Sequence, residues 1–129
     1  MPTKLTILVI LGFAFSSLQA QHVLDSIETK ILAAYSQSKQ TKSDQFAPII
    51  NTLEEAYQKD NDQKINYWIA FAEYRAAILF LNADMDKQSL EVLDRGIERL
   101  KAVETPNSED LALHGSMVSL SINFQPELA

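Results

Sequence analysis

The sequence predicts an all-α fold built from antiparallel helical hairpins. Apolar side chains recur every three or four residues in five separate stretches, which is the spacing of one helix face. Short polar segments such as Asp60-Asn61-Asp62 separate neighbouring stretches, and connections this short make consecutive helices antiparallel. A chain of 129 residues, 47% of them hydrophobic, has enough apolar surface for one packed core, so we expect a single helical domain.

The first residues have the composition of a secretory signal peptide. Lys4 precedes an apolar run at residues 5–15, and small and polar residues lead to Ala20. These eleven residues are too few to span a bilayer, which needs about 20. We therefore predict a signal peptide at 1–20 and a helical domain at 21–129 that is periplasmic or secreted, with no membrane span after cleavage. The alternative is that the segment forms a buried N-terminal helix.

Composition excludes several classes of partner and site. The net charge is −6 and the basic residues are scattered singly, whereas nucleic acids and anionic membrane surfaces require clustered Lys and Arg. The absence of cysteine excludes disulfides, thiolate metal sites and a cysteine nucleophile. We therefore expect no nucleic-acid partner, and a fold stabilised by helix packing alone.

The first two predicted helices form one hairpin. Residues 21–38 carry a single apolar stripe, and residues 48–59 carry another. Residues 37–44 contain no apolar side chain, so they are predicted to form a loop. Within this loop, Ser43 or Asp44 can cap the helix that follows.

A third predicted helix, at 63–82, lies at the centre of the fold because it is apolar on two faces. A helix of this kind is packed by neighbours on both sides. One stripe is Ile65, Trp68, Ile69, Ala72, Ala76 and Leu79, and the other is Tyr67, Phe71, Tyr74, Ile78 and Leu81.

A fourth predicted helix, at 87–103, is an ordinary amphipathic helix with one apolar stripe. Its charged residues, which include a Glu91–Arg95 pair four positions apart, are expected to form a solvated face. Each such pair is worth only about 0.2–0.5 kcal/mol. These charges are therefore weak evidence for a site.

A fifth predicted helix, at 108–123, has no partner helix after it, because six residues remain. Asn107, with Asp110 three positions later, resembles a capping arrangement at its start. The predicted order is therefore two helix pairs and one unpaired helix.

The hairpin at 65–103 resembles a tetratricopeptide repeat. That family places a small residue and then an aromatic residue on the first helix, and small residues early in the second helix and where the two helices cross. The matching residues here are Ala77, Phe80, Ser89 and Gly96. Leu93 stands where an aromatic residue is common, and the closing proline is displaced to Pro106. The resemblance implies antiparallel hairpins stacked in a right-handed superhelix.

A second part of the chain shares this resemblance. Gly115 follows Ala77 by 38 positions and resembles the small residue of a further first helix. The segment 107–117 is similar to one found in exported bacterial proteins of this repeat type. Members of that group continue with more helices, so the resemblance implies a short or truncated member.

The resemblance also implies a binding surface. In tetratricopeptide arrays, the first helix of each hairpin lines a concave groove that takes peptides. By spacing from Ala77, the groove side is Phe71, Tyr74, Ile78 and Asn82, with Glu109, Ala112, Ser116 and Ser119 from the last helix. We select Phe71, Tyr74, Asn82 and Ser116 as candidate binding residues, since aromatic side chains among polar ones suit peptide capture. The alternative is that Phe71, Tyr74 and Ile78 pack inside the fold, which we favour for Ile78.

The sequence contains no catalytic or metal-binding pattern. His22 and His114 lack the spacing of a zinc site. Residues 82–86 alternate like a calcium loop but lack its turn glycine and its closing glutamate. Glu54 and Glu55 are adjacent, so on a helix they point in different directions. No phosphate loop, dinucleotide fingerprint or nucleophile motif occurs, so we expect no enzyme activity, metal or cofactor.

These observations predict an exported protein that binds a protein or peptide as a scaffold or assembly factor. One alternative is a self-associating structural protein whose unpaired last helix docks on another copy, giving a homo-oligomer. Another is a truncated fragment without independent activity. An envelope hydrolase is a further alternative, but it lacks a recognisable pair of nucleophile and base.

Overall fold

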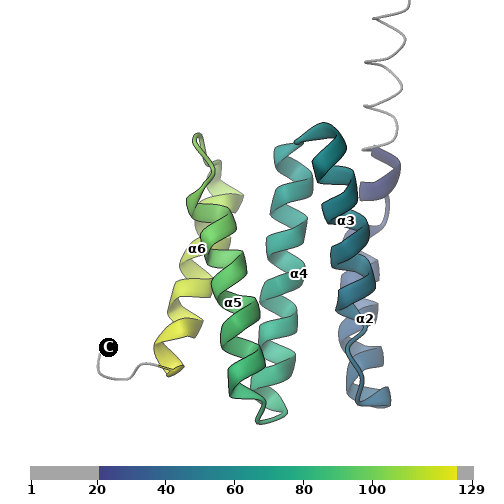
Figure 1. Ribbon diagram of the computed structural model, residues 1–129, viewed down its shortest axis with the longest axis vertical. Helices are drawn as coiled ribbons and strands as arrows, with labels where there is room; N and C mark the ends of the chain where they lie inside the picture. Colours follow the sequence, from purple (N-terminus) through teal and green to yellow (C-terminus); the bar gives the residue numbers. More distant parts are fainter. Residues whose placement is uncertain (1–20, 125–129) are drawn as a thin grey trace, which may run out of the picture.

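The computed structural model describes residues 21–124, and within this range the chain is helical with no strand. In chain order the elements are α2 (Ile27–Thr41), α3 (Phe46–Asp60), α4 (Gln63–Asn82), α5 (Asp86–Lys101), α6 (Ser108–Ser121) and the short 3-10 helix η1 (Ile122–Phe124). Figure 1 shows them side by side, running alternately up and down. The predicted all-α class is confirmed. The predicted signal peptide at 1–20 lies outside the described residues, as do residues 125–129.

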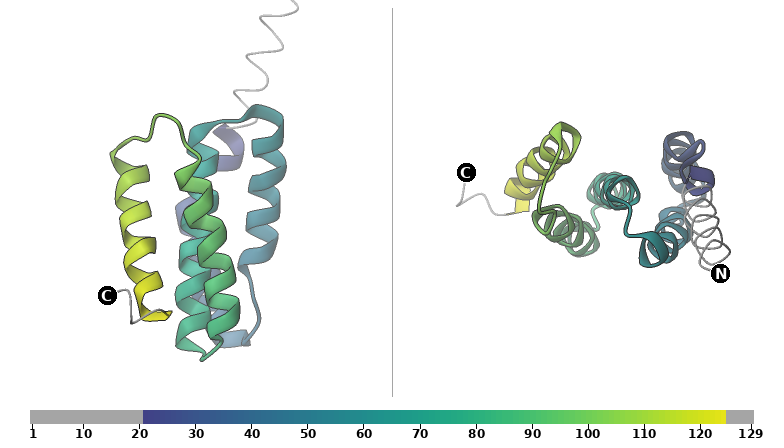
Figure 2. Two further views of the ribbon diagram at one scale, coloured as in Figure 1. Left: turned by 60° about the vertical axis from the view of Figure 1, so that its left-hand side comes forward. Right: turned by 90° about the horizontal axis from the view of Figure 1, so that it is seen from above.

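The helices form two layers, with α4 in the middle. Seen from above, α2, α4 and α6 lie on one side, and α3 and α5 lie on the other (Figure 2). α4 contacts α2, α3, α5 and α6, which confirms the prediction that residues 63–82 form the central helix. Within the described range, no helix combines the length and apolar character that a membrane span requires.

The two predicted stripes of α4 have different surroundings. Most of the first stripe is fully buried, including Ile65, Ile69 and Ala76. The second stripe, from Tyr67 to Leu81, is only half-buried. The reason is visible in Figure 2: α2 and α6 flank α4 within its own layer, so the α4 face opposite α3 and α5 stays partly open. The sequence overestimated the burial of this second face.

Small side chains let α4 and α5 approach closely. Ala77 and Ser89 are both fully buried, and the Ser89 hydroxyl donates a 2.7 Å hydrogen bond to the Ala77 carbonyl oxygen. Gly96 faces Met117 of α6, and a Cβ placed on Gly96 would collide with the Met117 methyl group. Each fully buried large apolar side chain around this contact stabilises the fold by about 1.5–3 kcal/mol.

Side-chain caps fix where two of the helices begin. The Asp62 carboxylate accepts a 2.8 Å hydrogen bond from the Lys64 amide at the start of α4. At the start of α6, Asn107 accepts from the Asp110 amide (2.9 Å) and Asp110 accepts from the Asn107 amide (3.1 Å). The predicted capping arrangement at Asn107 is confirmed. Such caps are worth about 1 kcal/mol each.

The structure corrects the predicted loop at 37–44. α2 continues to Thr41, because Ser38 is buried and its hydroxyl accepts a 3.0 Å hydrogen bond from the Gln45 amide. The chain then reverses at Lys42, whose φ of 55° is left-handed. The N-cap position of α3 is Gln45, which makes no side-chain cap, so the predicted cap at Ser43 or Asp44 is not found; Asp44 does accept a 2.8 Å hydrogen bond from the Phe46 amide. α3 therefore begins at Phe46, two residues before the predicted start at Pro48.

The first predicted helix is also interrupted. Residues 21–38 were expected to form one helix, but Ser26 has a left-handed φ of 58° and α2 starts after it. The apolar stripe survives this break, since Ile27, Ile31 and Ala34 are buried. Periodicity alone does not register a single left-handed residue, because the spacing on either side is unchanged.

Candidate functional site

The open face of α4 carries a cluster of three aromatic side chains, Tyr67, Trp68 and Phe71. The Trp68 ring meets Tyr67 edge-on at 5.2 Å and Phe71 edge-on at 5.3 Å between ring centroids. The Tyr67 and Phe71 rings are stacked at 6.3 Å. All three are half-buried, so each packs on the core and still offers contact area to a partner. We call these residues the aromatic cluster.

Two cationic side chains extend this surface towards α2. The Arg75 guanidinium lies 6.0 Å from the Phe71 ring centroid and 5.3 Å from that of Tyr35 on α2. The Lys39 ammonium lies 5.7 Å from the Tyr35 centroid. Cations within about 6 Å of an aromatic face are attracted by its quadrupole, with energies of about 0.5–1 kcal/mol at exposed sites. Arg75 thus links the aromatic cluster of α4 to α2.

Asn82, the last residue of α4, also contacts Tyr35 of α2. Its amide nitrogen donates a 3.3 Å hydrogen bond to the Tyr35 hydroxyl oxygen. The aromatic cluster, Arg75, Tyr35 and Asn82 therefore form one continuous surface along α4 and the neighbouring side of α2, which we call the α2–α4 face.

The four predicted binding residues are separated by the structure. Phe71 and Asn82 lie on the α2–α4 face. Tyr74 is half-buried and packs on the core, and neither aromatic pairing nor a hydrogen bond joins it to Phe71 among the described residues. Ser116 is exposed on α6, and its hydroxyl donates to the Ala112 carbonyl of its own helix at 3.0 Å. Ile78 is half-buried but is not among the side chains packed against the buried core.

Sequence reasoning missed Tyr35 and Arg75. Tyr35 falls within the apolar stripe of residues 21–38, and nothing in the helical pattern distinguishes Arg75. The available signal was composition: Lys64 and Arg75 are the only basic residues between Gln63 and Asn82, and Arg75 stands among aromatic side chains.

Burial raises the pKa of Tyr67, and the carboxylates of Glu109, Asp110 and Glu28 raise it further. Tyr67 is therefore a neutral phenol at neutral pH. A neutral phenol both donates and accepts hydrogen bonds, so this end of the aromatic cluster can bind a polar group of a partner.

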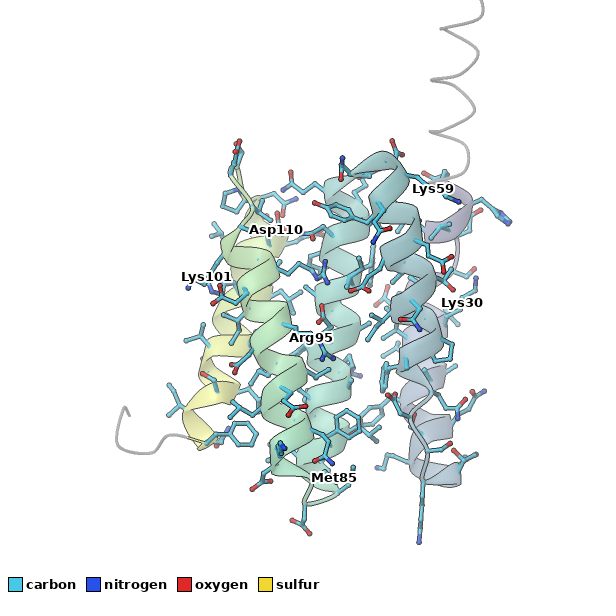
Figure 3. The ribbon with its side chains drawn as sticks, viewed as in Figure 1. Lys30, Lys59, Met85, Arg95, Lys101 and Asp110 are labelled. Carbon is cyan, nitrogen blue, oxygen red and sulfur yellow. The ribbon has the colours of Figure 1, made fainter. Side chains whose placement is uncertain are left out.

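A cluster of charged side chains lies where α3, α4 and α5 meet. Glu73 on α4 is 1% exposed, and one of its oxygens accepts a 2.9 Å hydrogen bond from Arg99 Nε on α5. Arg99 Nη2 also donates to Glu54 of α3 at 2.8 Å, and Arg95 Nε lies 3.5 Å from the second Glu73 oxygen. Figure 3 labels Arg95 on α5. We call Glu54, Glu73, Arg95 and Arg99 the charge cluster.

The charge cluster corrects two sequence expectations. The charges of α5 were expected to be solvated, yet the Arg99 side chain is only 18% exposed and bridges two helices. Arg95 was expected to pair with Glu91 on its own helix, but it pairs with Glu73 of α4. Helical spacing reports only neighbours on the same helix, and both partners of Arg99 are distant in sequence.

Burial raises the pKa of Glu73 above its ordinary value, and the guanidinium groups of Arg99 and Arg95 lower it without cancelling that effect. This carboxyl is desolvated and hydrogen-bonded between two helices. Its geometry is that of a clamp that holds α3, α4 and α5 together. Among the described residues, no group of three or more His, Cys, Asp and Glu side chains is arranged to hold a metal ion.

Comparison with known proteins adds no relative: no family model matches the chain, and neither a curated protein nor a solved structure matches it.

Proposed function

We propose that this chain is an exported, tetratricopeptide-like protein that binds proteins or peptides through the α2–α4 face, as a scaffold or assembly factor. The observation that carries the proposal is the half-buried aromatic cluster next to Arg75 and Tyr35. Aromatic and arginine side chains are the residues that dominate binding energy at protein interfaces, because they supply large contact areas at low entropic cost.

The helix arrangement supports a tetratricopeptide-like assignment. The first helices of the hairpins, α2, α4 and α6, share one layer (Figure 2), which is the layer where such repeats bind their ligands. The resemblance depends on small residues: Ala77 and Ser89 lie where α4 and α5 meet, and Gly96 of α5 faces Met117 of α6. Their role there is steric.

Binding is tested with a peptide array, followed by titration of the best peptide against purified protein. Phe71→Ala and Asn82→Ala are expected to raise the Kd at least tenfold, because both remove side chains of the α2–α4 face. Glu55→Ala, on the exposed side of α3, is the matched control and should leave the Kd unchanged. Ser116→Ala tests whether α6 contributes. If no peptide depends on Phe71 or Asn82, this binding surface is wrong.

Export is tested separately, by sequencing the N-terminus of the protein recovered from the periplasm or medium. The expected first residue is Gln21. Full-length protein retained in the cytoplasm would contradict export and leave the binding proposal standing.

A second candidate function, self-association, is favoured by the outward face of α6. Leu111 and Val118 of α6 are 57% and 42% exposed and lie seven positions apart, on one side of the helix, and Ile122 at the start of η1 is 39% exposed. Residues 111–124 carry no Asp, Glu, Lys or Arg, so two copies can meet there without like-charge repulsion despite a net charge of −6. A helix this short covers less area than the roughly 800 Å² per partner of a standard interface, so the dimer would be weak.

Sedimentation velocity at micromolar concentrations tests self-association. A dimer should be present in the wild type and lost in Leu111→Asp, while Leu32→Asp, at a 41% exposed position on α2, should behave as the wild type. A concentration-independent monomer would exclude this second function.

A further inference from the structure

A cavity of about 450 Å³ lies at the end of the molecule where α2 finishes and α4 turns into α5. Its apolar lining includes Leu79, Phe80 and Met85. Met85, which is labelled in Figure 3, lies in the turn between α4 and α5 and is 38% exposed. This volume lies within the range of about 300–1,000 Å³ typical of small-molecule sites. The cavity is therefore large enough and apolar enough to take a small organic ligand.

Two lysines, Lys39 and Lys42, also line this cavity. Neither forms an ion pair among the described residues, in contrast to Arg95, Arg99 and Lys101. The left-handed φ of 55° at Lys42 fixes the backbone direction at this point.

One carboxylate, that of Asp44, shares the lining. It is already engaged, because it accepts a hydrogen bond from the Phe46 amide. The Tyr35 hydroxyl and the Asn82 amide add neutral polar groups to the same cavity. The lining is thus apolar with a small excess of positive charge, in a chain whose net charge is −6.

We propose that this cavity binds a small anionic amphiphile, meaning an apolar chain that ends in one carboxylate. An apolar chain contacts Leu79, Phe80 and Met85 and removes their surface from water. The carboxylate accepts charge-assisted hydrogen bonds from the lysine ammonium groups, which a neutral head group cannot match. A multiply charged ligand fits less well, because the lining is mostly apolar and includes Asp44. This cavity shares Tyr35 and Asn82 with the α2–α4 face, but the proposal does not rest on peptide binding there.

The proposal is tested by isothermal titration of the full chain with decanoate, octanoate and decan-1-ol, all below the concentrations at which they aggregate. Decanoate should bind at least tenfold more tightly than decan-1-ol, because only the carboxylate pairs with lysine. Octanoate lacks two methylene groups and should bind about 15-fold more weakly than decanoate.

Variants test which side chains bind the carboxylate of the ligand and which bind its apolar chain. The double substitution K39Q/K42Q should weaken decanoate binding at least tenfold and leave decan-1-ol binding unchanged. The control K59Q/K64Q removes two lysines at the opposite end of the molecule and should leave both unchanged. Met85→Asp should weaken both ligands, and since Met85 is at an exposed turn, an unchanged circular dichroism spectrum will show that the fold is intact. The proposal is overturned if no ligand binds, if acid and alcohol bind equally, or if K39Q/K42Q behaves like its control.

Discussion

The contact between α4 and α5 and the outward face of α6 contain the same kind of small residue in opposite environments. A Cβ on Gly96 of α5 would collide with Met117 and would lie 3.5 Å from the Glu73 Cβ. A Cβ on Gly115 of α6 would meet nothing within 4 Å among the described residues. Gly96 is therefore required for close packing in this fold, and Gly115 is not.

This difference shows that a small residue stabilises a helix contact only when a neighbour occupies the space it leaves. In a helix interior, glycine costs about 1 kcal/mol relative to alanine. At Gly96 that cost is offset by the approach of Met117, whereas at Gly115 nothing within the described structure offsets it. The two regions therefore predict opposite effects for the same substitution.

The largest expected effect belongs to the charge cluster beside Gly96. Arg99→Met removes the guanidinium that pairs with the buried Glu73 carboxylate, and breaking such a buried pair costs about 3 kcal/mol. Urea unfolding should show this loss of stability. Lys101→Met is the control, because its pair with Glu98 is exposed and worth less than about 1 kcal/mol. Equal losses for the two variants would mean that the charge cluster is not a clamp.

Gly96→Ala comes next. The new methyl group displaces Met117, which costs about 1–3 kcal/mol, and the better helix propensity of alanine returns about 1 kcal/mol. A net destabilisation of about 1 kcal/mol is expected in thermal or urea unfolding. A stabilised variant would show that Met117 moves aside freely.

Gly115→Ala should act in the opposite direction. With open space around the Cβ, only helix propensity changes, so the variant should be more stable by about 0.5–1 kcal/mol. The same unfolding experiment checks it. Destabilisation would indicate that another helix covers α6 in solution, and comparison at two protein concentrations would show whether that helix belongs to a second copy.

The smallest expected effect is a pH dependence from Glu73. Burial raises the pKa of Glu73 in the native state above its ordinary value of 4.5, so the native protein holds this proton to a higher pH than the unfolded chain does. The contribution of Glu73 to stability must then fall as the pH rises from the unfolded pKa through the native one. Over this pH interval, the unfolding free energy of the wild type should fall relative to that of Glu73→Gln. A relative rise for the wild type would mean that the attraction of Arg99 outweighs the effect of burial.

Local sequence was sufficient to predict the helices, their order and the cap at Asn107. It was also sufficient to place residues 63–82 at the centre, because periodicity and capping depend on neighbours within a few positions. It failed at Ser26 and at Gln37–Thr41, where a left-handed residue and a buried Ser38 hydroxyl set the helix ends. Of the proposed binding residues, Phe71 and Asn82 were placed on one surface, while Tyr35 and Arg75 were found only from the structure.

The sequence by itself determined that this chain is helical, which residues can be buried, and that its first residues resemble an export signal. Only the tertiary structure decided which of these residues meet. Arg99 pairs with Glu73 and Glu54, and Tyr35 contacts Arg75 and Asn82, across separations of tens of positions. The physical reason is that helix formation depends on contacts between residues three or four apart. The desolvated charge cluster and the α2–α4 face depend on how whole helices pack.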